Sequence, residues 1–593
     1  MVLAIGCQVT EPATAPGTAP PDGVTPVDPV AAFRWNLASP ESHGMCGSTI
    51  QLGCTKTLQQ IWTDISNPKH NTKRFIVIRN DRVIFDRGGT SAYAVYSANK
   101  GLLGAPTLVH AMSQCGVGLT DPASRWLEHG EGARWGTDDP WNAITVEHLA
   151  THTSGICDYS NSSSVCRNEN PGWSTQFERA KDGGPNYVYP NDAFTIARAK
   201  AEQNTEPALA PGSILEYSNV AHTLMNYVVQ KACGQKLTDI FDLYIKQAGM
   251  GSAVAPARIT TDDAQLLNQS AGIAKWNGLH GAAVLRLAGR RGIWDNRNVE
   301  PVKYWHEVTK ITGNIPAAAA EGWGVVYENN SMDMWTRSSG YKRWSPETFG
   351  HGGKYSTVFL NDPLTSTIIV RQGENNAKGA SYLTLNGCQP GWTGTAPTCV
   401  PGSNWSNNWN VSAGTPGFPY VAPRKKVVEP LQQAFFFPPP FCRMTLAAGT
   451  PADNTTDVYD SPAGAATIDL AAEIQVNPRE GSGSSVVDRV EFFKETDAAA
   501  AVWIARGTLV PGTSPRQYRF SYPADSHGMV EEVRTYFANC VARSVVNNTK
   551  KVPSHSRPVR VRRLRRRTSC SASRPPVDSA KCSRSAASDP VRA

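Results

Sequence analysis

The sequence predicts an α+β domain built on an antiparallel sheet, followed along the chain by an all-β sandwich. The chain has 593 residues, which is too many for one hydrophobic core, because single cores stop growing at about 250–300 residues. Helix and strand signals alternate from about residue 32 to residue 372. Beyond residue 466 the pattern changes to short runs of alternating polarity, which are typical of strands.

The first domain, residues 32–385, has strand signals at both ends and helix signals between them. Phe75–Phe85 contains two β-rich runs around Asn80-Asp81, which is a hairpin signature. Helical spacing follows at Leu102–Met112 and at Ala221–Ala232, where Gly234 supplies a stop. Later strands are expected at Gly324–Tyr327, Thr357–Leu360 and Ser366–Arg371. We therefore expect the first hairpin and the last strands to share one antiparallel sheet.

Residues 386–440 are rich in Gly, Pro, Asn and Trp and predict a linker with its own disulfide loop. After it, residues 441–549 predict a β-sandwich of about 100 residues. Its expected strands are Thr467–Val476, Val486–Phe493, Val502–Leu509, Gln517–Tyr522 and Val533–Val541. Val487–Phe493 and Tyr536–Ala542 resemble strands of bacterial immunoglobulin-like domains. Residues 550–593, mostly Arg, Ser and Pro, predict a disordered tail.

Thirteen cysteines indicate an oxidising compartment, because short loops closed by disulfides are typical of exported proteins. The alternative is a set of scattered free thiols. Three pairs are close along the chain: Cys46 with Cys54, Cys157 with Cys166, and Cys388 with Cys399. Cys442 and Cys540 are a further candidate pair, joining the ends of the sandwich. Zinc is not expected, because no two-residue cysteine spacing recurs, and no other metal or cofactor is indicated.

Residues 1–31 predict an export remnant and a tether. Gly6 is the small residue expected before the Cys of a bacterial lipid-attachment site, so Cys7 is a candidate lipid anchor, although only six residues precede it. No run approaches the roughly 20 apolar residues that a membrane-spanning helix needs. We expect an exported protein, either periplasmic, extracellular or attached to the outer surface.

The net charge of +8 does not indicate a nucleic-acid partner. Thirteen of the 58 Lys and Arg residues, but only two of the 50 Asp and Glu residues, lie from Lys550 onward. The first 549 residues therefore carry a net charge of about −3. An Arg cluster at Arg562–Arg567 is the one phosphate-binding candidate, and an exported protein seldom meets nucleic acid.

Ser97 and Lys100 form a Ser-x-x-Lys motif directly before the expected helix. Residues three apart share a helix face, so the Lys amine can take the proton of the Ser hydroxyl. The motif also occurs at Ser66–Lys69, but Pro68 disfavours a helix there. The motif means little without a partner.

Tyr217-Ser218-Asn219 is the proposed partner, because it follows the Pro211-Gly212 turn and precedes a helix. A Tyr beside a Lys can pass a proton to the leaving group, and an Asn amide can bind a substrate carbonyl. The same pattern occurs at Tyr189–Asn191 and Tyr327–Asn329. The first of these matches lies in a loop-rich stretch, and the second lies at an expected strand end.

The third element is Gly350–Tyr355, which leads into the strand at Thr357. Its glycines, Gly352 and Gly353 among them, let substrate approach the backbone, and the Lys354 amide would join that of Ser97 as an oxyanion hole. His351 would set the electrostatics beside Lys100. Alone, such a histidine is more often a turn or core residue.

These three elements, in this order, resemble the serine β-lactamase and penicillin-binding-protein family. The segments Gly118–Ser124, Ile144–Ile156 and Gly278–Gly281 add to the likeness, which covers about residues 36–375. His152-Thr153-Ser154-Gly155 is characteristic of the branch holding AmpC-like β-lactamases, D-aminopeptidases and family VIII carboxylesterases. The likeness implies a sheet flanked by helices, with an inserted all-helical subdomain and Ser97 at their junction.

By the same resemblance, Ser97 is the nucleophile and Lys100 and Tyr217 are the general base and acid. Asn219 positions the substrate, and His351 stands where the family has the Lys of Lys-Thr-Gly. The family's hydroxyl residue is replaced by Gly352, which removes a group expected to hold a β-lactam carboxylate.

Two enzyme hypotheses and one other remain open. The first is a carboxylesterase acting on small or short-chain esters, or on related amides. The second is a β-lactamase or a peptidase acting on D-amino acid peptides of the cell wall. The third is a catalytically inactive binding protein whose sandwich attaches it to wall polysaccharide or to another protein. The aromatic-rich stretch Cys157–Ala210 either walls an acyl pocket or is a surface loop pinned by a disulfide.

Overall fold

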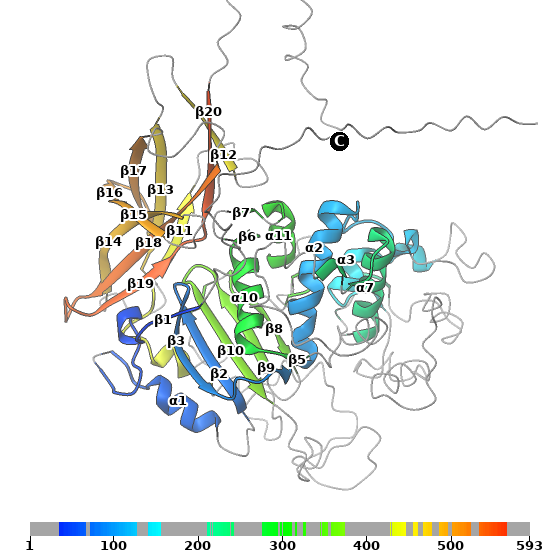
Figure 1. Ribbon diagram of the computed structural model, residues 1–593, viewed down its shortest axis with the longest axis horizontal. Coiled ribbons are helices and arrows are strands. Elements are labelled where there is room, and N and C mark those ends of the chain that lie inside the picture. Colours follow the sequence, from blue (N-terminus) through cyan, green and yellow to red (C-terminus); the bar gives the residue numbers. More distant parts are fainter. Residues whose placement is uncertain are drawn as a thin grey trace, which may run out of the picture.

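A computed structural model describes residues 35–155, 210–241, 275–373 and 427–565. Shorter gaps inside these ranges fall at 52, 67–71, 127–139, 214, 216–217, 238, 295–296, 299, 311–314, 317–323, 328–343, 346, 354–356, 428–429, 446–454, 461–466, 477–484, 496–500 and 524–532. The described part forms an α+β unit and a β-sandwich that lie beside each other (Figure 1). No helix among these residues is both long enough and apolar enough to cross a bilayer.

A six-stranded sheet is the centre of the α+β unit, in the order β1-β3-β2-β10-β9-β8. Its strands are β1 (Asn36–Leu37), β2 (Thr72–Arg79), β3 (Arg82–Gly88), β8 (Phe349–Gly353), β9 (Thr357–Asp362) and β10 (Thr367–Gly373). All neighbours are antiparallel except β1 and β3. The predicted sharing of one sheet by the first hairpin and the last strands is confirmed.

The turn between β2 and β3 explains why this hairpin forms. Asn80 and Asp81 have φ of 50° and 59°, and both central residues of the favoured two-residue hairpin turn need positive φ. Asn and Asp tolerate this conformation better than other residues with a Cβ. The Asn-Asp pair in the sequence therefore fixes the register of the two strands.

Helices cover both faces of the sheet (Figure 1). Successive residues of a strand point to opposite faces, so Ile76 and Ile78 of β2 join the core under α2 and α10, while Phe75 and Val77 join the core under α1. The helices are α1 (Leu58–Ile65), α2 (Ala105–Gln114), α3 (Val146–Ala150), α7 (Asn219–Cys233), α10 (Gly278–Gly289) and α11 (Val302–Thr309).

Two helix predictions are confirmed and one strand prediction is wrong. The expected helix at Leu102–Met112 is present, and α7 ends at Gly234, whose φ is 61°. Residues 325–327 form a bend rather than a strand, and the Gly324 N–H donates to the Tyr327 carbonyl across it. Val326 has a φ of 73° in this bend. Four mostly apolar residues were too short a run to distinguish a buried bend from a buried strand.

The expectation that residues 386–440 are a linker was wrong for the segment from residue 427. Here Val427, Leu431 and Phe435–Phe437 are buried in the core shared with α1 and the outer face of the sheet. Backbone bonds run from Cys46 N–H to the Ala434 carbonyl and from Phe436 N–H to the Gly44 carbonyl. The apolar aromatic run needed burial, and the Pro and Gly content around it obscured this.

The C-terminal unit contains a four-stranded sheet, β11-β13-β17-β16, and a second sheet, β12-β20-β18-β14-β15, with β19 paired to β18. All five expected strand regions are present. The strands are β11 (Phe441–Thr445), β12 (Thr455–Asp460), β13 (Thr467–Gln475), β14 (Ser485–Glu495), β15 (Ala501–Arg506), β16 (Thr508–Val510), β17 (Arg516–Pro523), β18 (Val533–Ser544), β19 (Lys551–His555) and β20 (Val559–Arg565). The arrangement fits a sandwich, and the immunoglobulin-like assignment stays a prediction.

The expectation that the chain is disordered from residue 550 was wrong for the residues that form β19 and β20. Val552, Val559 and Val561 are buried, whereas Arg562 is exposed. This alternation of inward Val and outward Arg is a strand pattern. The high Arg content concealed it, because composition averages over the two faces.

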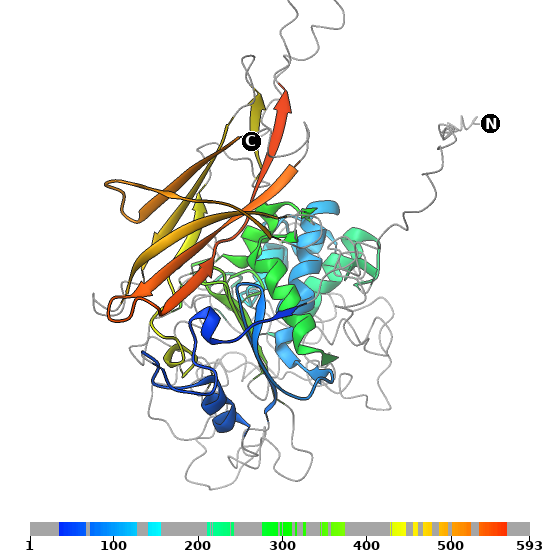
Figure 2. The ribbon, with the colours of Figure 1, turned by 60° about the vertical axis from the view of Figure 1, so that its left-hand side comes forward.

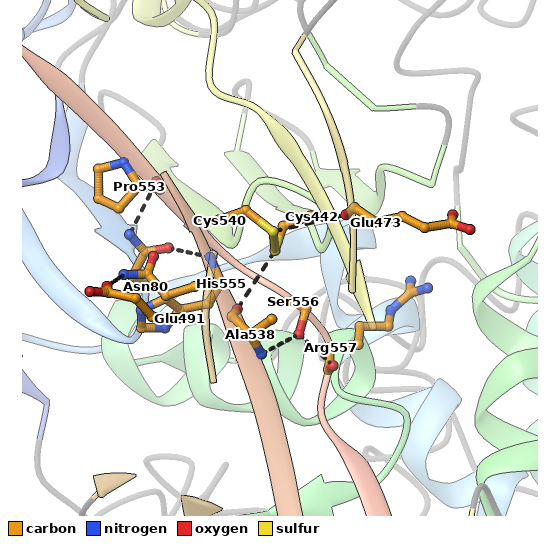
Figure 3. The surroundings of a disulfide bond; sticks show 11 residues. Asn80, Cys442, Glu473, Glu491, Ala538, Cys540, Pro553, His555, Ser556 and Arg557 are labelled. Atoms are coloured by element: carbon orange, nitrogen blue, oxygen red, sulfur yellow. Dashed lines mark hydrogen bonds between the residues drawn. A yellow bond between two sulfur atoms is a disulfide. The ribbon is translucent and has the colours of Figure 1, made fainter. Parts of the chain in front are cut away.

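The sandwich is fixed to the α+β unit at the end of the sheet where the β2–β3 and β9–β10 turns lie (Figure 2). The Asn80 side chain donates to the Pro553 carbonyl and accepts from the His555 N–H, at 3.3 and 2.9 Å (Figure 3). The Cys442 N–H donates to the Leu364 carbonyl at 2.9 Å. Arg557 and Arg443 both pair with Glu347, and Arg290 pairs with Glu495.

Three disulfides lie among the described residues. Cys46–Cys54 and Cys442–Cys540 confirm two predicted pairs. Cys115–Cys233, which joins the C-terminal ends of α2 and α7, was not predicted. The pairs Cys157 with Cys166 and Cys388 with Cys399 lie outside the described residues. Disulfides fit an exported protein.

Candidate active site

Ser97 and Lys100 lie where the helical core meets the sheet. Tyr96–Ala98 form a 3-10 turn, and Lys100–Gly104 form one turn of π-helix that continues into α2. The motif therefore spans two tight helical turns rather than the regular helix that was expected. Ser97 is half-buried and Lys100 is completely buried. Single π-turns inside helices occur frequently at functional sites.

Two glycines allow other side chains to pack closely against the π-turn. A Cβ on Gly101 would come within 2.8 Å of the Tyr327 ring, and one on Gly104 within 2.7 Å of the His222 Nε2. The Tyr327 hydroxyl donates to the Gly101 carbonyl at 2.9 Å. Burial raises the pKa of Tyr327 above its usual range, so the phenol keeps its proton and remains a donor. These contacts fix the backbone that carries Lys100.

The edge strand β8 packs directly against the turn that carries Ser97. A Cβ on Gly353 would lie 2.2 Å from the Val95 carbonyl oxygen and 3.3 Å from the Ala98 nitrogen, so only glycine fits at this position. On the other side, the Trp276 indole N–H donates to the Asn99 side chain at 2.9 Å. The backbone between Val95 and Lys100 is therefore held from both sides.

Three buried histidines, His152, His222 and His351, surround Lys100. Burial, the charge of Lys100 and the neighbouring His351 lower the pKa values of His152 and His222 well below the ordinary value, so both rings are neutral. Their rings stack with centroids 6.1 Å apart. The His351 Nδ1–H donates to the Gly352 carbonyl at 2.6 Å, and its Cβ packs on Gly101.

The structure brings five of the eight predicted site residues together: Ser97, Lys100, His351, Gly352 and Gly353. Tyr217 and Lys354 lie outside the described residues. Asn219 is the first residue of α7. Ser218, between Tyr217 and Asn219, is buried and caps α7 by accepting from the Ala221 N–H at 3.1 Å. The roles of all eight residues remain predictions.

Sequence reasoning missed His222 and Tyr327 and gave His152 no function. His152 belongs to the His-Thr-Ser-Gly segment that carried the family likeness, so its signal was visible but was used only for recognition. Tyr327 appeared only as a second match to the Tyr-x-Asn pattern. His222 has no motif around it, and its position one helical turn after Ser218 becomes informative only with α7 in place.

One cluster among the described residues has the spacing of a metal site. His110, Cys115 and Cys233 offer atoms within 4.8 Å of one another. The two cysteines are joined in a disulfide, however, and metals bind cysteine as the thiolate. His110 is also bonded to Glu300 at 2.9 Å. Nothing in this cluster supports a role in the candidate site.

The site combines a half-buried Ser, a buried Lys three residues later and a glycine-rich edge strand, between an antiparallel sheet and a helical layer. This is the arrangement expected of an acyl-transfer serine hydrolase. Residues 74–261 match the family model named Beta-lactamase. This part of the chain is similar to the β-lactamase family. Strands β8 to β10, which complete the sheet, lie beyond the matched residues.

Solved structures of the same fold resemble the chain at low identity. A D-stereospecific amidohydrolase from Streptomyces sp. is 19% identical over 53% of this chain and 92% of its own, with a TM-score of 0.35. EstA from Arthrobacter nitroguajacolicus Rue61a is 12% identical over 56% and 94%, with a TM-score of 0.34. A penicillin-binding protein from Bacillus halodurans is 14% identical over 54% and 94%, with a TM-score of 0.35. None of the curated proteins compared with the chain matches it.

Proposed function

We propose that the protein is a serine hydrolase that forms an acyl-enzyme on Ser97 and acts as a carboxylesterase on small or short-chain esters, and on related amides. The observation that carries this proposal is the complete burial of Lys100 on a rigidly packed turn three residues after Ser97. Burial penalises a charged ammonium. A neutral amine at this position can accept the proton of the Ser97 hydroxyl.

The reaction follows from this proton transfer. The Ser97 oxygen attacks the ester carbonyl, its proton passes to Lys100, and the carbonyl oxygen becomes negative. The Ser97 and Lys354 amides stabilise that oxyanion. The alcohol leaves with a proton delivered through Tyr217, and the acyl group stays on Ser97. Water then attacks the acyl-enzyme with the same groups acting in reverse, which releases the acid and restores the hydroxyl.

The neutral histidines support the proposal. A charged carboxylate beside Lys100 would hold the ammonium form, whereas neutral imidazoles do not. Burial is the first cause of the lowered pKa values of His152 and His222, so both rings stay neutral. Neither ring therefore offers a negative charge that would hold Lys100 in its ammonium form.

The preference for esters over β-lactams rests on Gly352. It lies buried on β8 beside His351, at the position where a hydroxyl is expected to hold a β-lactam carboxylate. Without that hydroxyl, an acyl donor that carries no carboxylate loses nothing on binding, whereas a β-lactam loses a hydrogen bond to a charged group, worth about 1.5–3 kcal/mol.

The test is turnover of p-nitrophenyl butyrate, nitrocefin and a D-Ala-D-Ala peptide by the purified protein, together with labelling by a fluorophosphonate. We expect ester turnover and labelling at Ser97. Ser97→Ala should abolish labelling and lower kcat by at least about 1,000-fold, as expected for loss of a nucleophile. Turnover of nitrocefin alone would instead identify a β-lactamase.

Failure of the fluorophosphonate to label folded protein would leave a binding protein. In that case Ser97→Ala would bind wall polysaccharide as the unaltered protein does, with the sandwich as the contact. A candidate lipid anchor at Cys7 is checked separately, by the mass of protein isolated from its native host.

A further inference from the structure

The segment that carries Tyr217 is attached at two points to the segment His152–Gly155. The Gly212 N–H donates to the Thr153 carbonyl at 2.8 Å. The His152 Nδ1 lies 3.2 Å from the Ser218 nitrogen and 3.1 Å from the Ser218 oxygen. One attachment precedes Tyr217 by five residues and the other is on the residue that follows it.

His152 faces both polar groups of the Ser218 backbone with one ring atom. A neutral ring satisfies either arrangement, since Nδ1 accepts from the N–H in one tautomer and donates to the carbonyl in the other. Burial lowers the pKa of His152 well below the ordinary value. The ring therefore stays neutral at the pH where a hydrolase works.

The backbone of His152 is itself unusual. Its φ is 59°, in the left-handed region where residues other than glycine are uncommon and where His, Asn and Asp are enriched. The turn is reinforced on both sides, because the Thr151 hydroxyl donates to the Glu147 carbonyl at 2.7 Å and the Thr153 N–H donates to the His148 carbonyl at 2.9 Å. The imidazole direction is thus fixed by the end of α3.

The same ring also contacts the layer that carries Lys100. It stacks on His222, and His222 packs on Gly104 of the π-turn. A continuous path of buried contacts therefore runs from Ser218 through His152 and His222 to the π-turn. Tyr217 itself lies outside the described residues and precedes Ser218 directly in the chain.

We propose that His152 is a positioning residue whose imidazole holds the backbone of Ser218, the residue next in the chain to the proposed proton donor Tyr217. This inference rests on the proposed function, because it gives Tyr217 the role of proton donor. It predicts a loss in kcat with little change in KM, since misplacing a proton-transfer group by about 1 Å can cost about 100-fold in rate.

The experiment compares His152→Gly with His152→Asn. Glycine adopts the same φ at no steric cost but has no side chain, whereas asparagine tolerates this φ and keeps an amide that can bond to Ser218. We expect kcat for p-nitrophenyl butyrate to fall about 100-fold in the glycine variant and to stay within about tenfold in the asparagine variant. His306→Asn, at a half-buried histidine of α11, is the matched control and should leave kcat unchanged.

Hydrogen exchange of the peptide covering residues 210–221 gives a readout that needs no substrate. It should speed up in His152→Gly and remain slow in His152→Asn. If the unaltered protein neither hydrolyses esters nor reacts with the fluorophosphonate, yet exchange responds to the glycine variant, the proposed function fails and the positioning role stands.

Ester turnover by the unaltered protein, with kcat and exchange the same in His152→Gly, would overturn the positioning role alone. If the glycine variant does not fold, the asparagine variant alone decides. A folded His152→Asn variant whose kcat has fallen by more than about 100-fold would overturn the positioning role. Retained activity and slow exchange in that variant would support it.

Discussion

Gly353 determines how closely the edge strand β8 can approach the turn that carries Ser97. Its place against the Val95 carbonyl leaves no room for a Cβ, and the clash would be with backbone rather than with a movable side chain. Any substitution must displace either β8 or the 3-10 turn. Ser97, on the 3-10 turn, and Lys354, which follows β8 directly in the chain, are the proposed sources of the oxyanion amides. A displacement of either segment is therefore expected to affect the oxyanion hole.

Gly353→Ala should therefore slow fluorophosphonate labelling of Ser97 by up to about 100-fold, because an error of about 1 Å in a catalytic geometry costs that much. Gly507→Ala is the comparison variant. A Cβ on Gly507 would meet the Phe492 ring at 2.8 Å inside the sandwich, which should lower thermal stability and leave labelling unchanged. Equal labelling of both variants would contradict the role given to Gly353.

At the level of single residues, the sequence predicted that the segments of Ser97, Lys100 and His351 come together, but not the backbone conformation that brings them together. Ser97, Lys100 and His351 were found because their motifs have fixed spacing and order. The 3-10 and π-turns around Lys100 could not be predicted, because they result from the tertiary packing of Tyr327 and His222 on two glycines. His222 carries no motif, so its place beside Lys100 needed the helix packing.

At the level of elements, the Cys115–Cys233 disulfide joins the ends of α2 and α7, the two helices that follow Lys100 and Tyr217 in the chain. It encloses a sequence separation of 118 residues, whereas Cys46–Cys54 encloses 8. Longer closed loops restrict the unfolded chain more. The long-range disulfide should therefore contribute more to stability.

Replacing both Cys115 and Cys233 by Ala should lower the free energy of unfolding by about 5 kcal/mol in the chain-entropy description, against about 2.5 kcal/mol for the Cys46 and Cys54 pair. Urea unfolding of the two double variants, followed by circular dichroism, measures the difference. A larger loss for the short loop would mean that the restriction of the unfolded chain does not control the stability gained.

Strands were predicted well where polarity alternates and poorly where composition dominates. The strands from β13 to β18 have clear alternation and lie within a few residues of the expected bounds. In β20 the same alternation of Val and Arg was hidden by the high local charge. The segment 427–440 shows the opposite failure, because its aromatic residues were read as part of a Pro-rich linker although they complete a core.

At the level of the whole molecule, the two units share a hydrophobic core. Leu431 and Phe435 pack with Phe75 and Leu360 on the outer face of the sheet, and Val552 of the sandwich joins the same core. Removing the C-terminal part therefore exposes apolar surface of the α+β unit. The unit predicted to end at residue 385 depends on residues well beyond that boundary.

A chain truncated after residue 385 should accumulate in the insoluble fraction and bind ANS, because the outer face of the sheet loses its cover. A chain truncated after residue 440 keeps the aromatic segment and should be more soluble. Truncation after residue 565 keeps every described strand and is the control that should match the full chain. A soluble, active chain ending at residue 385 would contradict the shared core.

The contact between the two units should weaken in acid. Burial lowers the pKa of His555 to about 4, with Arg79 and Arg290 acting in the same direction and Asp81 opposing them. Because this pKa lies below the ordinary value of about 6.5, the unfolded chain takes up a proton first as the pH falls. The contribution to stability is complete above about pH 6.5 and is lost between pH 6.5 and about 4.

For one proton the slope of the free energy of unfolding against pH is at most about 1.4 kcal/mol per pH unit. His555→Gln should flatten the dependence in this window relative to the unaltered protein. Urea unfolding at pH 7, 5.5 and 4.5 gives the comparison. Parallel curves for the two proteins would show that His555 does not titrate on unfolding. Burial also lowers the pKa of His43 to about 3, so residual acid sensitivity is expected.

Strand β9 runs between the candidate site and the contact with the sandwich. At Thr357 it adjoins Gly353 and the turn of Ser97, and beyond Asp362 its connection to β10 touches the sandwich through Leu364. Six residues of strand span about 20 Å. A single molecule can therefore contact both the turn that carries Ser97 and the contact with the C-terminal unit only if it is longer than about 20 Å.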